Sequence, residues 1–152
     1  MMRWASTIEE FAACREILGH PEVWPHHSPV KLDQVPDLTG RVCCFEPDAA
    51  MYLFDRMNDE GTLWGVHSSV VPEHRARSHE LTAKARNLLF HTFEQAQEIW
   101  TLIPEYNTPA KRLALACGMT PQFDRDGVWN DQPVTYYMVT RDVSTEMERK
   151  GI

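Results

Sequence analysis

The chain has 152 residues, of which 43% are hydrophobic, and its formal net charge at pH 7 is −7. This length and hydrophobic content support one core, so we expect a single domain over residues 1–152. The negative charge argues against a large interface with nucleic-acid phosphates, which requires a basic face, and favours neutral or cationic partners.

The cysteines form neither a CxxC pair nor a zinc-binding spacing. Cys43 and Cys44 are adjacent, which suits alternating positions in a strand better than a disulfide framework and indicates a reducing compartment. The first residues lack the apolar core of a signal peptide, and no run approaches the roughly 18 apolar residues of a membrane span. We therefore expect a soluble cytoplasmic protein with no membrane partner.

Apolar residues at helical spacing predict a first helix over about residues 7–18, and Ser6 and Glu9 have the spacing of a capping box. The next 21 residues contain four prolines, which predicts a loop with one short helical turn and room to form a lid. Three apolar runs follow, the last two separated by the turn sequence NDEG. They predict a meander of antiparallel strands: RVCCFE (41–46), AMYLFDRM (50–57) and TLWGVHSSVV (62–71).

A long amphipathic helix is expected from Leu81, because apolar residues recur at helical spacing as far as Ala96. This helix would pack on the sheet. The run EIWTLIP (98–104) then predicts a further strand.

The last third of the chain predicts a short helix and a hairpin. Thr108 as N-cap and Pro109 in the first turn open the helix, and Gly118 ends it. Segments 119–127 and 132–142 form the hairpin. The order of helix, three strands, helix, strand, helix and two strands indicates a mixed α/β fold.

The turn between the third strand and the long helix carries a family pattern. Val70, Pro72 and Arg75 fit V-x-P-x-x-(Q/R)-x-x-G-x-(G/A), which in the GNAT superfamily of acetyl-CoA-dependent N-acetyltransferases ends the central strand and opens the next helix. Ser78 and Glu80 stand at the two glycine-type positions. The chain thus resembles this superfamily over most of its length, best from about residue 62 to residue 137.

The missing glycines change what could hold a diphosphate. A helix N-terminus binds phosphate through free N–H groups, and glycine allows close approach to the backbone. Arg75 and Arg77 can supply positive charge, and Ser78 can donate its hydroxyl and cap the helix. Glu80 would repel a diphosphate if it pointed at it. The alternative is an ordinary exposed basic turn.

A second block, IPEYNTPAKRLALACGM (103–119), resembles the strand, asparagine and short helix of the same superfamily. Asn107 stands at the asparagine that faces the pantetheine arm, and Gly118-Met119 takes the place of Gly-Phe. Ala114 departs from the pattern, because many members carry a tyrosine there that protonates the leaving thiolate.

The resemblance implies an α/β fold with a mixed, mostly antiparallel central sheet, splayed middle strands and flanking helices. It implies acetyl-CoA as co-substrate and no metal. The long first loop and the missing glycines look most like divergent phage-encoded or prophage-encoded members, which would act in the host cytoplasm. The expected cofactor-binding residues are Val70, Val71, Arg75, Ala76, Arg77, Ser78, His79, Asn107 and Lys111.

Amine acetylation requires a base for the amine proton and donors for the developing oxyanion. His67, on the strand leading into the turn, is the best candidate for the base, since histidine titrates near neutral pH. The alternative is a strand histidine that faces solvent or is hydrogen-bonded in the core. The resemblance implies that a strand amide near Val70 supplies the oxyanion donor.

The acid missing at Ala114 could be replaced by Tyr106, Tyr136 or Tyr137, and Tyr106 is the one that we predict to be catalytic, although strand aromatics are more often core. Acidic residues at the hairpin tips could line an amine-accepting mouth, although such tips are usually only solvated. These are Asp55, Asp59, Glu60, Asp124 and Asp126. His20, His26 and His27 match no standard metal site.

Three functions remain open at this stage. The first is transfer of an acetyl group to a primary amine by direct attack, on a small molecule, a peptide or a modified nucleobase. The second is a catalytically inactive GNAT-like binding or virion-associated phage protein, which the missing glycines and tyrosine favour. The third is an unrelated α/β binding domain. A homodimer is compatible with each.

Overall fold

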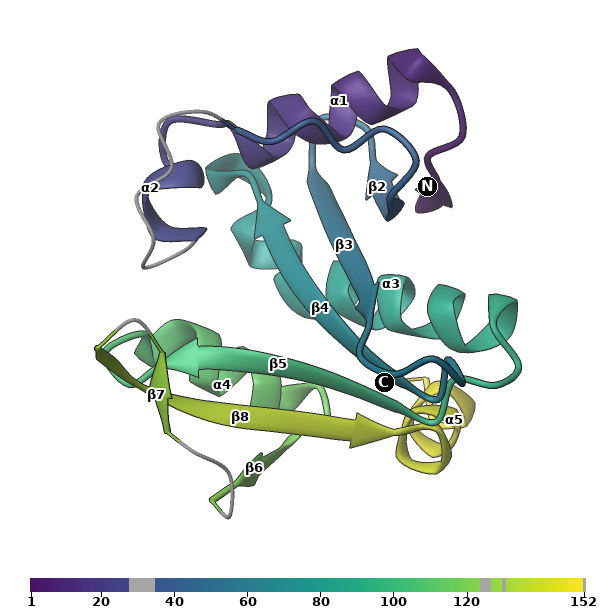
Figure 1. Ribbon diagram of the computed structural model, residues 1–152, viewed down its shortest axis with the longest axis vertical. Coiled ribbons are helices and arrows are strands. Elements are labelled where there is room, and N and C mark those ends of the chain that lie inside the picture. The colour runs from purple at the N-terminus through teal and green to yellow at the C-terminus, as the bar shows by residue number, and fades with distance from the viewer. Residues whose placement is uncertain (28–34, 124–126, 130, 152) are drawn as a thin grey trace.

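The computed structural model describes residues 1–27, 35–123, 127–129 and 131–151. The strands of this part form a sheet in the order β1-β2-β3-β4-β5-β8-β6, with β7 paired to the start of β8 (Figure 1). Only β4 and β5 run parallel to each other. The strands are β1 (Arg3–Trp4), β2 (Val42–Glu46), β3 (Ala50–Arg56), β4 (Leu63–Val70), β5 (Glu98–Pro104), β6 (Thr120–Gln122), β7 (Val128–Trp129) and β8 (Gln132–Thr140).

The sheet opens at its middle. β4 and β5 are in register over three residue pairs only, ending at Gly65 and Trp100. β5 then stays paired with β8 along its whole length, whereas β4 stays with β3, so the two central strands diverge (Figure 1). The predicted mostly antiparallel sheet with splayed middle strands is confirmed, and so is the predicted meander of β2, β3 and β4.

Helices cover both faces of the sheet. The helical segments are α1 (Ile8–Leu18), α2 (Trp24–His27), the 3-10 helix η1 (Pro72–Arg77), α3 (Ser78–Thr92), α4 (Thr108–Ala116) and α5 (Arg141–Arg149). Along β3, Met51 and Leu53 pack towards α1, while Tyr52 and Phe54 pack towards α3. Because both faces are buried, the strand reads as a continuous apolar run and not as a polar alternation.

The predicted first helix is confirmed, but its cap lies one residue later than expected. Thr7 Oγ1 accepts a hydrogen bond from the Glu10 amide, and a Glu10 carboxylate oxygen accepts one from the Thr7 amide, each at 3.1 Å. The Ser6–Glu9 capping box is therefore wrong. Two hydroxyl residues each precede a glutamate by three positions, and Arg3, 3.1 Å from Glu10, favours the second pair.

The short helix α4 likewise begins one residue earlier than the sequence indicated. Asn107, not Thr108, is its N-cap, and its side-chain oxygen accepts from the Ala110 amide at 3.2 Å. Gly118 follows the helix with a φ of +83°, which is the left-handed conformation expected of a terminating glycine.

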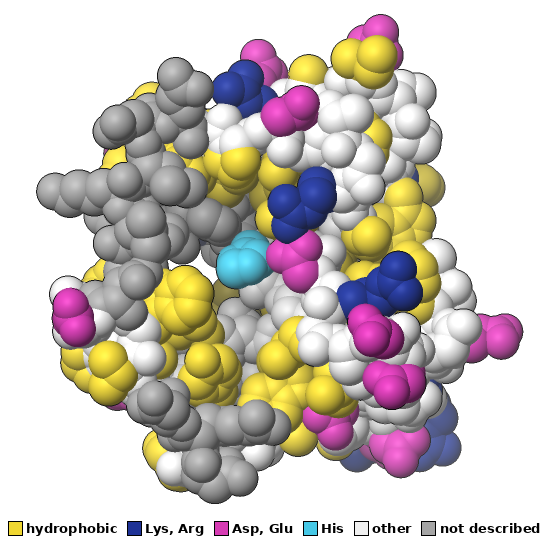
Figure 2. All heavy atoms as spheres, viewed as in Figure 1, with side chains coloured by type: hydrophobic (Ala, Val, Ile, Leu, Met, Phe, Trp, Pro, Cys, Tyr) yellow, Lys and Arg dark blue, Asp and Glu magenta, His cyan; other side chains and the backbone are white. Residues whose placement is uncertain are grey.

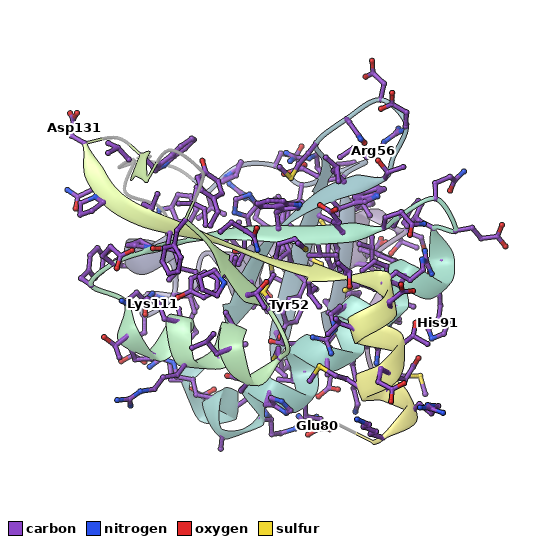
Figure 3. The ribbon with its side chains drawn as sticks, turned by 90° about the horizontal axis from the view of Figure 1, so that it is seen from below. Tyr52, Arg56, Glu80, His91, Lys111 and Asp131 are labelled. Carbon is purple, nitrogen blue, oxygen red and sulfur yellow. The ribbon has the colours of Figure 1, made fainter. Side chains whose placement is uncertain are left out.

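Sequence reasoning missed β1, β7 and η1, and it missed α5, a mostly polar segment whose apolar residues are limited to Val143 and Met147. α5 is anchored by Arg141, whose guanidinium donates to the carbonyl oxygens of Phe90, Phe93 and Ala96, each at 2.8 Å. These bonds join the start of α5 to the end of α3, and Figure 3 shows the two helices side by side below the sheet.

Candidate active site

The splay between β4 and β5 opens into a groove of about 650 Å³. It is lined on one side of the sheet by α1, α2 and Leu53 of β3, and on the other by α3 and α4, so it passes through the plane of the sheet. Figure 2 shows one mouth of this hollow, where histidine, acidic and basic side chains adjoin and hydrophobic side chains surround them. A groove of this kind can hold one substrate on each side of the sheet.

Some backbone amide groups of β4 point into the gap between β4 and β5. The Val71 amide donates to the Ala49 carbonyl at 2.9 Å, which fixes the odd-numbered residues of the strand as those that bond β3. The amides of Ser68 and Val70 therefore point towards β5, from which β4 has already separated. On the same edge the Val66 carbonyl accepts from Thr101 Oγ1 at 3.2 Å. These two amides thus lie beyond the last residue pair of β4 and β5, and no described strand pairs with them on this edge.

His67 lines the groove with about half (50%) of its side chain exposed. Its Nε2 lies 3.8 Å from a carboxylate oxygen of Asp55, and the other carboxylate oxygen pairs with Arg41. Burial in the groove lowers the pKa of His67 below its ordinary value, Asp55 opposes this shift, and Arg41 adds to it. The imidazole is therefore neutral at neutral pH and can accept a proton.

The basic turn forms as the 3-10 helix η1, which runs directly into α3. Val71 is buried at its start, and its amide is already bonded to Ala49. Ser78 is the first residue of α3 with helical φ and ψ, and the N-cap position belongs to Arg77, which makes no side-chain capping bond. The expectation that Ser78 caps this helix is therefore wrong, since a capping residue must have non-helical dihedral angles.

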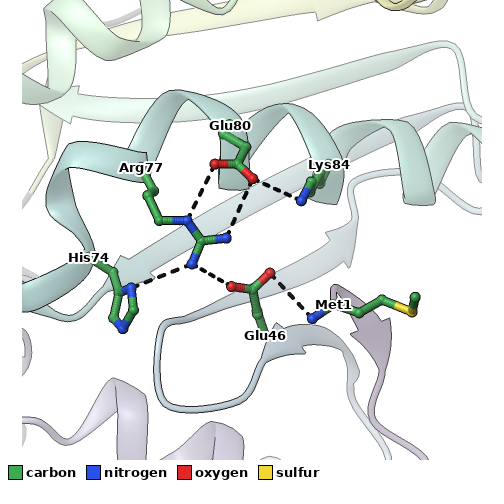
Figure 4. A network of polar contacts seen from close by, with 6 residues as sticks. All are labelled: Met1, Glu46, His74, Arg77, Glu80 and Lys84. Atoms are coloured by element: carbon green, nitrogen blue, oxygen red, sulfur yellow. Dashed lines mark hydrogen bonds and ion pairs between the residues drawn. The ribbon is translucent and has the colours of Figure 1, made fainter.

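Arg77 is the centre of a polar network (Figure 4). Its guanidinium lies 2.6 Å from Glu46 and 3.3 Å from Glu80, and Lys84 lies 2.9 Å from the same Glu80 carboxylate. Hydrogen bonds from Arg77 and Lys84 lower the pKa of Glu80 to about 2. The glutamate at the second glycine-type position is thus turned towards two cations, and its charge is compensated within the protein.

The comparisons with known proteins come from structures alone. No family model matches the chain, and no curated protein does. Aminoglycoside acetyltransferase AAC(6')-Ib in complex with coenzyme A superposes with a TM-score of 0.72 over 100% of this chain and 99% of that one, at 17% identity. Spermidine N-acetyltransferase from Vibrio cholerae, with coenzyme A and spermine, gives 0.67 over 95% and 97%, at 15% identity. This chain has the GNAT acetyltransferase fold.

Of the nine predicted cofactor residues, eight are not among the described residues that line the groove of this GNAT fold, and three of these eight make contacts elsewhere. The Arg75 side chain is exposed and donates to the Glu22 carbonyl at 3.3 Å. His79 Nε2 lies 3.1 Å from the Ala116 carbonyl and so joins α3 to α4. Lys111, on α4 (Figure 3), pairs with Glu105 at 3.2 Å. Asn107, by contrast, lines the groove as well as capping α4.

The predicted catalytic pair is not brought together. Tyr106 is 67% exposed in the loop after β5, and it is not part of the groove wall. Of the three tyrosines considered for the acid, Tyr136 lines the groove, while Tyr137 is buried in the core. The pattern of β8 contained the signal that could have found Tyr136, because adjacent residues on a strand face opposite sides of the sheet.

Two further groove residues escaped sequence reasoning. Tyr52, seen in the interior in Figure 3, has its hydroxyl 3.0 Å from that of Thr82, and burial raises its pKa. Arg86 is buried on α3 with one nitrogen donating to the Cys117 carbonyl, while its Nε and Nη2 have no hydrogen-bond partner among the described residues. Arg86 lies one helical turn before Phe90, on the buried face of α3. A charged residue at such an apolar position was the sequence signal that could have identified it.

The described residues include no group of three His, Cys, Asp or Glu placed to hold a metal ion. In the same part of the chain, no helix is long and apolar enough to span a membrane. Of the acidic residues considered for an amine-accepting mouth, Asp55 lines the groove, whereas Asp124 and Asp126 lie outside the described residues.

Proposed function

We propose that the protein transfers the acetyl group of acetyl-CoA to a primary amine by direct attack. The observation that carries this proposal is the groove through the splay, into which β4 turns the Ser68 and Val70 amides beside a neutral His67. Solved structures of the same fold contain coenzyme A with kanamycin or spermine, which supports a two-substrate groove.

The η1–α3 junction is the proposed site for the diphosphate of acetyl-CoA. The Ser78 amide already donates to the Arg75 carbonyl of η1, so a diphosphate would meet the positive end of the helix dipole and the exposed Arg75 cation next to it. Asn107 would face the pantetheine arm where the strands part. We assign Arg77 to holding the turn through Glu46 and Glu80 and not to direct contact with phosphate.

The bound thioester supplies an activated carbonyl carbon and a thiolate leaving group. His67 accepts the proton that the attacking amine must lose, and Asp55 stabilises the imidazolium that results. The Ser68 and Val70 amides donate to the carbonyl oxygen as negative charge develops on it. Tyr136, the groove tyrosine among the three considered, is placed better than Tyr106 to protonate the thiolate.

Calorimetric titration with acetyl-CoA and with coenzyme A tests the cofactor site. We expect micromolar binding, which Arg75→Ala weakens at least tenfold, or about 1.4 kcal/mol. Arg149→Ala is the matched control, because it removes an exposed arginine of α5, and its binding should equal that of the unchanged protein. Absence of binding to the unchanged protein would reject the proposed function.

The inactive binding module is the second candidate, and Ala114 is the observation that favours it. This alanine leaves α4 without the acid that many proteins of this fold carry. Tight acetyl-CoA binding with no acetylation of any amine would support the module. Tyr136→Phe also distinguishes the enzyme from the inactive module. Loss of turnover in this variant, but not in Tyr106→Phe, would show that a tyrosine on β8 serves as the acid in place of a residue on α4.

A further inference from the structure

The part of the groove on the α1–α2 side has an apolar wall. Leu18 of α1, Trp24 of α2, Leu53 of β3 and Met57 line it, together with Trp100 of β5 and Trp129 of β7. Met57 is 50% exposed and Trp129 is 42% exposed, so large apolar side chains stand at the mouth. The indole rings of Trp24 and Trp129, the buried ring of Trp100 and the Met57 thioether along one wall form a surface suited to a flat hydrophobic body.

The charged groups in the groove are few, and its one described carboxylate lies near two basic side chains. Among the described residues that line it, Asp55 is the one carboxylate, and Arg41 and Arg86 are the cations. Arg41 pairs with Asp55, and His67 lies 3.8 Å from the same carboxylate. The groove therefore offers a polycation no second carboxylate among the described residues that line it, and additional ammonium groups would meet arginine or indole.

We propose that the acceptor is a compound with a single primary amine on a flat apolar body, such as an arylalkylamine, and not a polycation. This inference rests on the proposed function and names its substrate class. It separates the chain from the neighbours of the same fold that were crystallised with kanamycin or spermine, since both of those acceptors carry several amines.

The reaction balances with the groups already assigned. The amine nitrogen forms a bond to the acetyl carbon, the carbon–sulfur bond breaks, the amine proton passes to His67, and the thiolate of coenzyme A takes a proton from Tyr136 or from water. The apolar body stays against Trp129 and Met57 during this step, which directs the amine towards the splay.

The test compares tryptamine and 2-phenylethylamine with spermine and kanamycin. We expect kcat/KM for the two aryl amines to be at least tenfold above that for the two polycations. Binding of tryptamine and of spermine to the protein saturated with coenzyme A, measured by calorimetry, should give the same order without any turnover. Equal or higher values for spermine or kanamycin would overturn the inference, and so would failure of both aryl amines to bind.

Three variants sharpen this test. Trp129→Ala should lower kcat/KM for tryptamine at least tenfold, whereas Val128→Ala, the matched change of an exposed neighbour outside the groove, should not change it. Arg41→Gln removes the guanidinium that pairs with Asp55, and this should raise the affinity for spermine several-fold more than the affinity for tryptamine. No loss in Trp129→Ala would overturn the inference.

The outcomes also distinguish this inference from the proposed function. Preferential turnover of spermine would reject the acceptor class and leave acetyl transfer standing. Aryl-amine binding that depends on Trp129, in a protein that does not bind acetyl-CoA, would reject acetyl transfer and leave the preference for a flat monoamine standing.

Discussion

At the scale of single residues, His67 and Asp55 decide how the groove responds to pH. The imidazole is half-exposed, and its pKa is lowered first by burial, against the opposing effect of Asp55. The proposed mechanism uses the neutral form of His67 as a base. Activity should therefore be lost as the pH falls through the pKa of His67, and be fully present above it.

We expect kcat, measured at saturating amine, to rise with pH with a midpoint below the ordinary histidine pKa of about 6.5. Asp55→Asn removes the charge that raises the pKa of His67, so the acidic limb should move to lower pH. A pH profile of the unchanged protein and of Asp55→Asn checks this. Asp59→Asn, at a hairpin tip outside the groove, is the control, and a limb that moves to higher pH in Asp55→Asn would contradict the assignment.

At the scale of elements, the helices and strands with apolar periodicity could be predicted from the sequence. The exact ends of the helices and the mostly polar elements could not. Apolar periodicity located α1, α3 and the strands β2 to β5 because those elements bury a stripe or both faces. It missed α5, whose anchor is one arginine that donates to three carbonyl groups at the end of α3 and in the loop after it. It misplaced two caps by one residue, because adjacent hydroxyl or amide residues satisfy the same local rule.

Asn107 caps the start of α4 and also lines the groove. Asn107→Ala removes the cap of α4 and should lower the free energy of unfolding by about 1 kcal/mol, measured by urea denaturation. Asn107→Asp keeps the accepting oxygen and should keep most of that stability. If the Asn107 amide also donates to acetyl-CoA, both variants should weaken its binding, so weaker binding in Asn107→Asp at unchanged stability separates the two roles.

At the scale of the whole molecule, the splay is a long-range property that residue patterns did not contain. Local periodicity predicted that β4 and β5 are strands, but it could not show that they pair over three residues and then separate, and this expectation came from the resemblance. The same holds for the groove, where residues from four helices and five strands far apart in sequence meet. Arg86 and Tyr52 were hidden for this reason, since each reads locally as an ordinary position on an amphipathic helix or a buried strand.

The Arg77 network connects three distant parts of the chain at the proposed cofactor site. Glu46 ends β2, Arg77 and Glu80 belong to the η1–α3 junction, and the amino group of Met1 lies 3.5 Å from Glu46 (Figure 4). The pKa values of Glu46 and Glu80 are lowered, in each case chiefly by hydrogen bonds from Arg77. Lowered carboxylate pKa values contribute stability above the unfolded pKa of about 4.3, and this contribution is lost as the pH falls through the folded values.

The fall in unfolding free energy between about pH 5 and pH 2 should therefore be smaller in Arg77→Ala than in the unchanged protein. Urea denaturation at a series of pH values measures this slope. Arg149→Ala is the matched control, because it removes the arginine of an exposed pair with Glu146 on α5, and its slope should equal that of the unchanged protein. If Arg77→Ala keeps the full acid dependence, the junction is not held by this network, and Arg77 would instead be available to bind phosphate together with Arg75.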